Sequence, residues 1–421
     1  MTIAELYESR KDDPRLNTSY PLHPEDWAKY RVDGPLPFNN EKQLSFYIHT
    51  PFCKQLCSFC EYTRMLCPDE GMQERYLRAV ANDIMRFKEQ NQDFTLLGCD
   101  IGGGTPTALS EKNFLLLMEV YGNALKGLEL SPGYEPSIEA TFDTLTESKL
   151  KGIVNAGIHR LSLGVQSSCD VIMKRHRRLG SDEKQMSDWL AMAESIGVKK
   201  VNLDFMYGFQ GQNEVSIGRD LELIGHLRPH QVTLYELRTN MLTSNASLSK
   251  EELYDQYSRY YDGITGMGYK GRFGQNTFSM NADDEGVSSY LKERMINGAS
   301  YKGFGLSAQS MSCAGVSYNV GKLSKDPMQA LNDNGYQEEY TYLLPPKELA
   351  AKYMAISAYH GSFSVNKLLE FGIDKVFLDE RLDFCFSQGL LSKGENDRIV
   401  VTKKGFVHYG AVFSLFFEES E

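Results

Sequence analysis

The segment PFCKQLCSFC, residues 51–60, combines three closely spaced cysteines with a position directly after a strand-like run. The preceding residues 44–50 read LSFYIHT, an apolar run typical of a buried β-strand. Cys53, Cys57 and Cys60 follow that run at spacings of four and three residues. Thiolates are soft ligands that suit iron–sulfur clusters, and three of them leave one iron of a 4Fe–4S cubane open to a cofactor or substrate.

Two other interpretations of the cysteines stay open at the level of the sequence. The three thiols could belong to a structural zinc site completed by His49 or Cys67. They could also be ordinary buried thiols, because free cysteine behaves as a small apolar residue. The position of the motif after the first strand of a repeating series favours the cluster.

Strand-like and helix-like patterns alternate after this motif, which predicts an α/β fold. Helices with apolar residues at helical spacing separate the strands. Consecutive strands in such a series pair in parallel through right-handed crossovers, so we predict a partial (β/α)6 barrel. The six expected strands are residues 44–50, 96–101, 137–142, 159–166, 199–207 and 231–235.

Three polar residues near the carboxyl ends of these strands are expected to share one cavity. In residues 137–142, 159–166 and 199–207, apolar side chains alternate with polar ones. Because side chains alternate faces along a strand, packing of the apolar set on the outer helices turns the polar set inward. The inward residues are Glu139, Gln166 and Asp204. Each alone could instead be tied to a neighbouring loop.

A glycine-rich turn, GGGTP at residues 102–106, follows the second strand. Its glycines allow the backbone to approach a ligand closely and free its N–H groups to point at it. The turn lacks the Gly-Lys-Ser/Thr sequence of a Walker loop and the spacing of a dinucleotide fingerprint. Such a turn is weak evidence by itself.

Four segments are expected from the change of pattern along the chain. Residues 1–43 are rich in proline and predict an irregular arm. Residues 44–240 form the barrel, and residues 241–344 complete it and connect it to the rest. Residues 345–421 predict helices followed by a β-ribbon, a winged-helix-like domain that covers the barrel mouth.

The composition excludes several classes of protein. Of 421 residues, 41% are hydrophobic and 24% charged, which is ordinary globular usage. The net charge is −11, with 45 basic against 56 acidic residues, so a nucleic-acid partner is not expected. No apolar run of about 18 residues and no apolar leader core occurs, so we expect a cytoplasmic protein without a membrane partner. The crowding of three of the eight cysteines indicates a metal site rather than a disulfide framework.

The ordered motifs resemble a known family. YIHTPF before CxxxCxxC, then GGGTP, IEATFD, LSLGVQ, KRHRRLG and VNLDFMYG, are similar to the radical S-adenosylmethionine (SAM) enzymes of the oxygen-independent coproporphyrinogen III oxidase, or HemN-like, family. The resemblance covers residues 45–237 closely. It implies a radical SAM barrel with a 4Fe–4S cluster on Cys53, Cys57 and Cys60, whose open iron binds SAM. An electron from a carrier such as flavodoxin or ferredoxin would then split SAM into methionine and a 5′-deoxyadenosyl radical.

The resemblance also implies where two SAM molecules bind. Positions that hold the first match Tyr47, Gly103 and Glu139. Two further positions, Arg238 and Gln309, are carried over near these pockets. Positions that line the second pocket match Phe59, Gly104, Thr105, Gln166, Arg178 and Asp204. From the residues alone, the basic run 174–178 around Arg178 is also typical of a solvated helix face.

One departure from the family bears on the reaction. The porphyrinogen oxidases continue their motif as CGCN, whereas this chain reads Cys60-Glu61-Tyr62. We therefore expect a radical SAM enzyme that uses the second SAM as methyl or methylene donor and C-methylates or cyclopropanates an unsaturated small molecule. The expected catalytic set is the three cysteines with Glu139 and Asp204. The alternatives are an oxidative decarboxylase of the coproporphyrinogen III oxidase type and a non-catalytic haem chaperone.

Overall fold

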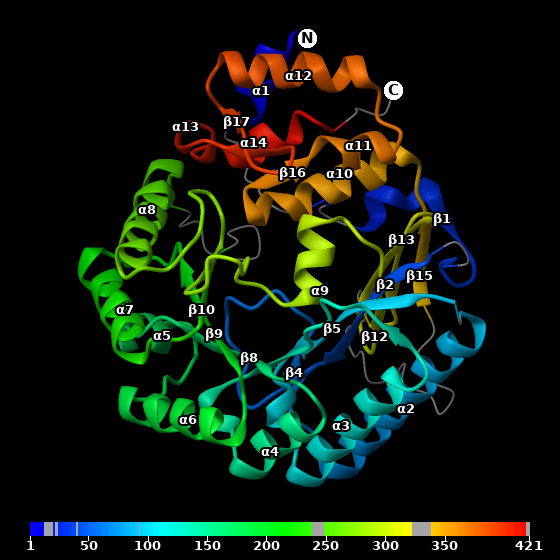
Figure 1. Cartoon of the computed structure of the whole chain (residues 1–421), viewed down its shortest axis with the longest axis vertical. Coiled ribbons are helices and arrows are strands. Elements are labelled where there is room, and N and C mark those ends of the chain that lie inside the picture. The colour runs from blue at the N-terminus through cyan, green and yellow to red at the C-terminus, as the bar shows by residue number, and fades with distance from the viewer. Residues whose placement is uncertain are drawn as a thin grey trace.

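Six parallel strands, neighbours in chain order, form the centre of one large curved sheet in the computed structural model (Figure 1). The structure describes residues 1–11, 20–21, 24–38, 41–91, 93–237, 248–321 and 338–417. Each central strand starts within about one residue of its predicted start, which confirms the α/β prediction. The strands are β2 (Gln43–Thr50), β5 (Thr95–Gly103), β7 (Ser137–Ala140), β8 (Arg160–Gln166), β9 (Lys200–Tyr207) and β10 (Gln231–Glu236).

Helices line the convex outer face of the sheet and form the arc seen in Figure 1. Each of the helices named below begins at a Ser, Thr, Asp or Asn whose side chain accepts a backbone N–H of the first turn, which satisfies a donor that the helix leaves unpaired. Their apolar faces pack on the sheet in one continuous core. The helices are α2 (Glu70–Gln90), α3 (Glu111–Leu125), α4 (Glu147–Asn155), α6 (Glu183–Ile196), α7 (Glu214–Leu227) and α8 (Lys250–Gly266).

The barrel is partial, because the sheet continues at both edges instead of closing on itself. Beyond β10 lies the antiparallel β11 (Thr277–Ser279). Beyond β2 lies the parallel β12, followed by antiparallel strands. These are β12 (Tyr301–Phe304), β13 (Gln309–Ser312), β14 (Gly315–Asn319), β15 (Glu338–Leu343) and β1 (Arg31–Val32). The short β6 (Glu129–Leu130) pairs with β5 alone.

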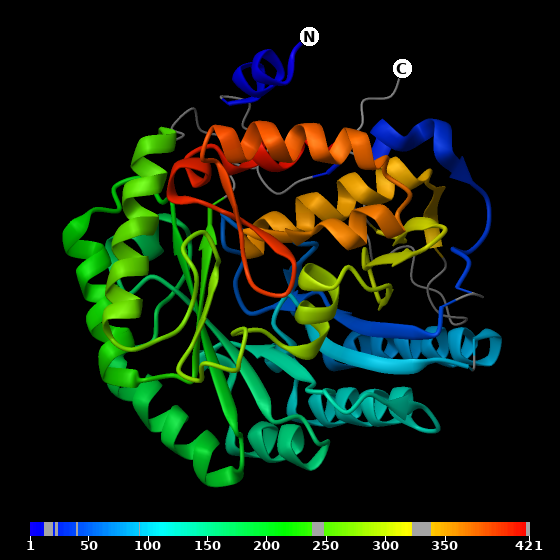
Figure 2. The same cartoon turned by 45° about the horizontal axis from the view of Figure 1, so that its top comes forward.

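The C-terminal part is a small domain with the element order of a winged helix, as the sequence predicts. Its antiparallel sheet has the order β16-β18-β17. Figure 2 shows this part lying across one end of the barrel. Its elements are α10 (Pro346–Ser357), β16 (Ser362–Ser364), α11 (Val365–Glu370), α12 (Lys375–Ser387), β17 (Leu391–Lys393), β18 (Arg398–Val401), α13 (Lys403–Phe406) and α14 (Tyr409–Ser414).

The N-terminal arm is more regular than the sequence prediction. Residues of α1 (Ile3–Arg10) form a helix that starts in a capping box between Thr2 and Glu5. This helix packs on the C-terminal domain, where the ring of Tyr7 lies 6.1 Å from that of Phe384. The irregular arm predicted for residues 1–43 is therefore wrong for this helix. The T-x-x-E signal was present in the sequence but too short to outweigh the many prolines.

A buried polar cluster joins the C-terminal domain to the segment around β11. Arg272 Nη2 lies 2.8 Å from His360 Nε2, and Glu285 Oε2 lies 3.4 Å from the same nitrogen. His360 is only 1% exposed. Burial lowers the pKa of His360 to about 4, opposed by Glu285 and reinforced by Arg272 and Arg398. The imidazole is therefore neutral at neutral pH.

We expect the substitution His360→Gln to remove part of the acid sensitivity of the fold. Between pH 6.5 and 4 the unfolded state binds more protons at this position, so the free energy of unfolding falls as pH drops through that window. The full loss is about 3 kcal/mol, at about 1.4 kcal/mol per pKa unit. Urea unfolding at pH 7 and pH 4.5 measures it, with the exposed His226→Gln as control. An equal acid dependence of wild type and His360→Gln would contradict this role.

Candidate active site

The cysteine segment forms a loop that is closed at its base. β3 (Phe52–Cys53) pairs in parallel with β4 (Met65–Leu66), and Cys67 N donates to Cys53 O over 2.9 Å. Because β3 follows β2 after one residue, the loop sits at the carboxyl end of the first barrel strand. Cys53 and Cys57 are buried and Cys60 is partly buried.

The three thiols fit a cluster that they would hold as thiolates. Burial, the largest cause, raises the pKa of Cys53 to about 11 and also raises that of Cys60, and the neighbouring Cys57 raises both further. Two guanidinium groups lie beside them. Arg178 Nη1 is 3.7 Å from Cys57 Sγ, and Arg64 lowers the pKa of Cys53 and Cys60. These cations would offset the negative charge that three thiolates bring to a bound cluster.

The zinc alternative can be compared with the placement of its expected ligands. Within the described ranges, no group of three or more His, Cys, Asp or Glu side chains is placed to share one metal ion. Zinc needs its sulfurs about 2.3 Å from the metal, so they must lie within about 4 Å of one another. The two proposed fourth ligands are also engaged elsewhere. Cys67 Sγ donates to Ala108 O over 3.3 Å, and His49 Nε2 lies 3.0 Å from Thr63 O.

The glycine-rich turn lies directly against the base of this loop. Gly104 N donates to Thr50 O and Thr105 N to Phe52 O, each over 2.8 Å. The Thr105 hydroxyl lies 3.8 Å from Cys53 Sγ and lowers the pKa of that thiol. Gly103 has φ +111° and donates its N–H to Glu139 Oε2 over 3.1 Å. The turn therefore connects the cysteine loop to the carboxylate of the third strand.

Glu139 and Asp204 share the interior of the barrel, as the alternation predicts. Burial raises the pKa of Glu139 to about 7, and the charge of Asp204 is the second cause. The side chain of Glu139 is nevertheless exposed to solvent. Both observations hold because protein surrounds the carboxyl group while an open space remains next to it. We call the space bordered by Glu139, Asp204, Tyr47 and Tyr235 the chamber. Glu139 raises the pKa of both tyrosines, and Asp204 raises that of Tyr235.

A hydrogen-bonded layer supports Asp204 from the floor of the chamber. Asp204 accepts from the Ser162 hydroxyl over 3.0 Å and from Asn202 Nδ2 over 2.8 Å. Burial raises the pKa of Asp204, while these donors and nearby Arg160 lower it. The aspartate is thereby fixed in one orientation.

Tyr47, on β2, lies in a row of tyrosines along one wall. Its ring stacks on Tyr290 at 5.6 Å, and Tyr290 meets Tyr301 edge-on at 6.0 Å. Gln309 lies farther along the same sheet, where its amide accepts from the Tyr301 hydroxyl and donates to Tyr318 over 2.8 Å. Gln309 thus forms these hydrogen bonds with tyrosines of the wall and not with the glycine turn. Arg238 falls outside the described residues.

The remaining predicted residues lie on the opposite side of the cysteine loop. Phe59 packs in a small apolar cluster with residues of α5 (Asp170–Arg175) and lies 5.7 Å from Phe209. Gln166 ends β8 with φ +72°, at an irregularity of the strand register. Arg178 donates to Gly164 O and to Cys57 Sγ. The alternative of a solvated helix face for residues 174–178 does not hold for Arg178, because the chain turns back onto the loop after α5.

Tyr235 borders the chamber and Tyr62 lies near it, and neither residue was predicted. Tyr62 follows the third cysteine, is 56% exposed, and raises the pKa of both Tyr47 and Tyr235. Tyr235 lies on β10 on the same face as Thr233, which bonds to Asn202. The alternation of side chains in the strand sequence QVTLYE could have predicted that Tyr235 faces inward with Thr233. Tyr62 lies in the cysteine loop, where no strand or helix periodicity predicts its position.

Comparison with known proteins agrees with this geometry. The model of the radical SAM superfamily matches residues 47–224. The chain is 31% identical over 194 residues to the heme chaperone HemW of Bacillus subtilis, covering 46% of this chain and 50% of that protein. It is 28% identical over 244 residues to the anaerobic coproporphyrinogen III oxidase 1 of Cereibacter sphaeroides, covering 55% and 50%.

A solved structure extends the likeness to most of the fold. Coproporphyrinogen III oxidase (HemN) from Escherichia coli, described as a radical SAM enzyme, superposes with a TM-score of 0.72 over 90% of each chain at 21% identity. At this identity the likeness concerns the fold. The chain spans about half the length of the curated relatives it matches. Within the described residues, no helix has both the length and the apolar character needed to cross a membrane.

Proposed function

Since the chain belongs to the radical SAM superfamily and to its HemN-like family, we propose that Cys53, Cys57 and Cys60 hold a 4Fe–4S cluster that serves the reductive cleavage of SAM. When bound, such a cluster supplies the electron that splits SAM into methionine and a 5′-deoxyadenosyl radical. A small carrier such as flavodoxin or ferredoxin would deliver the electron. The observation that carries the proposal is the placement of the cysteine loop against the glycine turn, which bonds to Glu139 in the chamber.

The chain's own residues orient SAM in this proposal. Glu139, aimed at the turn by the N–H of Gly103, would pair with the SAM ammonium group, and Tyr47 would close the same side. A second SAM molecule is proposed at the residues on the far side of the loop and the chamber floor. These are Phe59, Gly104, Thr105, Gln166, Arg178 and Asp204.

For the reaction itself, we propose oxidative decarboxylation of a porphyrinogen-type substrate. Support comes from the coproporphyrinogen III oxidases among the relatives and from a fold shared over 90% of the chain. In this reaction a propionate side chain loses one hydrogen atom to the radical and then carbon dioxide, while one electron passes to an external acceptor. Transfer of a methyl or methylene group, expected from the departure after Cys60, has no counterpart in the relatives compared above. The experiment described in the next paragraph also tests for this transfer.

Haem delivery is the second candidate, because a heme chaperone matches this chain at 31% identity. One incubation and a separate haem titration of the same protein distinguish the three functions. Reconstituted protein is incubated without oxygen with dithionite, methyl-deuterated SAM and coproporphyrinogen III, and the products are identified by mass spectrometry. We expect 5′-deoxyadenosine and a product that has lost carbon dioxide and two hydrogens per propionate, without deuterium. Deuterium in the product would establish methyl or methylene transfer instead. Tight haem binding without SAM cleavage would establish a carrier.

The proposed pairing of Glu139 with SAM makes binding dependent on pH. Only the carboxylate attracts the ammonium group, and the pKa of Glu139 in the free protein is about 7. Affinity for SAM should therefore rise about eightfold between pH 6 and pH 7.5, as the ionised fraction grows. Equilibrium dialysis without reductant measures it. Glu139→Gln should bind weakly at both pH values, whereas the exposed Glu129→Gln should behave as wild type. A pH slope retained by Glu139→Gln would assign it to another group.

A further inference from the structure

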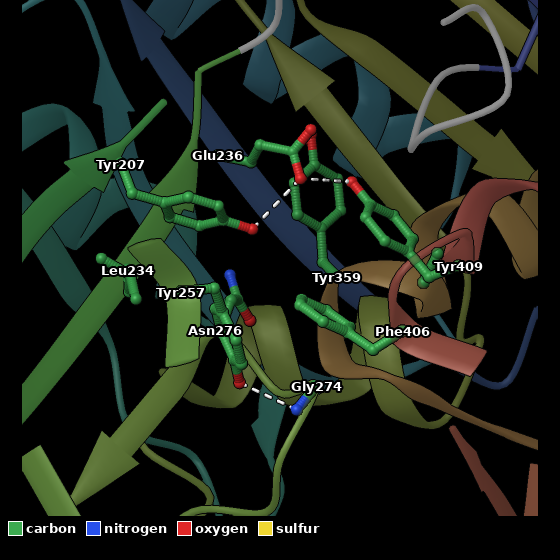
Figure 3. A pocket seen from close by; sticks show the side chains of 10 residues that line it. Tyr207, Leu234, Glu236, Tyr257, Gly274, Asn276, Tyr359, Phe406 and Tyr409 are labelled. Atoms are coloured by element: carbon green, nitrogen blue, oxygen red, sulfur yellow. Dashed lines mark hydrogen bonds between the residues drawn. The ribbon is translucent and has the colours of Figure 1, made fainter. Parts of the chain in front are cut away.

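A second cavity lies outside the chamber, between the barrel and the C-terminal domain (Figure 3). It is lined by ten residues and is open to solvent on one side. The barrel contributes the ends of β9 and β10, and α8 contributes Tyr257. The C-terminal part contributes Ala358 and Tyr359, Phe406 of α13 and Tyr409 of α14.

The alternation of strand residues separates this cavity from the chamber. On β10, Thr233 and Tyr235 face inward. Thr233 donates a hydrogen bond to Asn202, and the charge of Asp204 raises the pKa of Tyr235. Glu236 follows Tyr235 and therefore faces outward. On β9, Tyr207 is opposite Glu236 in the register and faces outward in the same way. The wall of the cavity is thus the outer face of the strands whose inner face forms the chamber.

Glu236 is the one charged residue among the ten that line the cavity. Its Oε2 accepts from the hydroxyls of Tyr207 and Tyr409, each over 3.1 Å. These bonds hold the carboxylate in place without neutralising its charge. Figure 3 shows Glu236 between the two hydroxyls, above the rings of Tyr257 and Phe406.

Aromatic faces and one amide complete the lining. The rings of Tyr257 and Phe406 lie 4.4 Å apart, and Phe406 stacks on Tyr409 at 5.4 Å. Only 9% of Asn276 is exposed, and its Oδ1 has no hydrogen-bond partner among the described residues. An aromatic box with a single carboxylate and an unsatisfied amide matches a positively charged organic ligand, because ring faces attract cations.

We propose that this cavity binds a small molecule bearing an ammonium group. The cationic group would lie against Glu236 and the aromatic faces, and a polar part of the ligand would reach the Asn276 amide. Glu236 and Tyr359 are both partly exposed, so the ligand would enter the cavity between them. Because Tyr409 and Phe406 belong to the C-terminal domain, a bound ligand would hold this domain on the barrel. It would also fix the end of β10, where Tyr235 faces the chamber.

Choline and its uncharged isostere 3,3-dimethylbutan-1-ol test the proposal directly. They have the same shape, so a difference in binding reports the cation alone. Calorimetric titration of the reconstituted full chain should show binding of choline and at least about tenfold weaker binding of the alcohol. Glu236→Gln keeps the shape of the side chain and should weaken choline binding by about tenfold or more. Glu222→Gln, exposed on α7, is the matched control and should bind as wild type.

A second variant keeps the test informative if Glu236→Gln folds poorly. Tyr359→Leu removes an aromatic face but leaves the carboxylate, and should also weaken choline binding while the alcohol is unaffected. Circular dichroism verifies that each variant is folded. Three results would overturn the proposal: no binding of choline, equal binding of choline and the alcohol, or unchanged affinity of folded Glu236→Gln. The readout is binding alone, so it does not depend on the proposed reaction.

Discussion

Cys57→Ala is expected to abolish SAM cleavage. The variant should retain much less iron and sulfide after reconstitution. It should also form 5′-deoxyadenosine more than about 100-fold more slowly than wild type, a larger loss than follows from removing a residue that only supports a ligand. The reason is that three thiolates hold the cluster in the proposed site, and the two nearby side chains considered as replacements among the described residues have other partners. Cys67 is bonded to Ala108 O, and His49 to Thr63 O. Iron and sulfide quantification with chromatography of 5′-deoxyadenosine measures both effects.

Cys67→Ala is the matched control for this prediction. It removes a partly buried thiol that lies directly after the closing pair of β3 and β4, whereas Cys57 is buried. We expect it to keep wild-type iron and at least half of the wild-type rate. If Cys57→Ala kept its cluster while Cys67→Ala lost it, the ligand set would be Cys53, Cys60 and Cys67. The assignment of Cys57 as a ligand from the cysteine spacing would then be wrong.

The parts of the site that the sequence predicts correctly are those set by local pattern. Alternation along a strand fixes which side chains point inward, so Glu139 and Asp204 could be placed in one interior before any coordinates. Helical periodicity fixed the outer layer in the same way. The glycine turn and the cysteine loop follow directly after strands, and parallel strands bring such turns to one end of a sheet.

Other features depend on contacts between distant segments. Arg178 reaches Cys57 across 121 residues of chain, and its basic surroundings in the sequence indicate a solvated face instead. Tyr290 joins the wall next to Tyr47 from a segment beyond the repeating units, where no periodicity predicts it. The bond between Glu236 and Tyr409 spans 173 residues and exists only because the C-terminal domain docks there.

Gly103→Ala is expected to destabilise the fold and distort the site together. Gly103 has φ +111°, and a methyl group there would lie 2.3 Å from the ring of His49, which is buried. The strained backbone costs about 1–2 kcal/mol and the overpacking about 1–3 kcal/mol. Relief of either would move the N–H that Gly103 donates to Glu139. We therefore expect about 3 kcal/mol lower free energy of unfolding, measured by urea denaturation, and weaker SAM binding.

Gly122→Ala supplies the contrast, because both substitutions add one methyl group. Gly122 lies in α3, has no atom within 4 Å of its added Cβ, and is exposed. Alanine should there raise the free energy of unfolding by about 0.5–1 kcal/mol, since it restricts the unfolded chain and favours the helix. If Gly103→Ala were as stable as wild type and bound SAM equally well, the turn would tolerate a side chain. The close approach of backbone and imidazole would then not be what holds Glu139 at the cysteine loop.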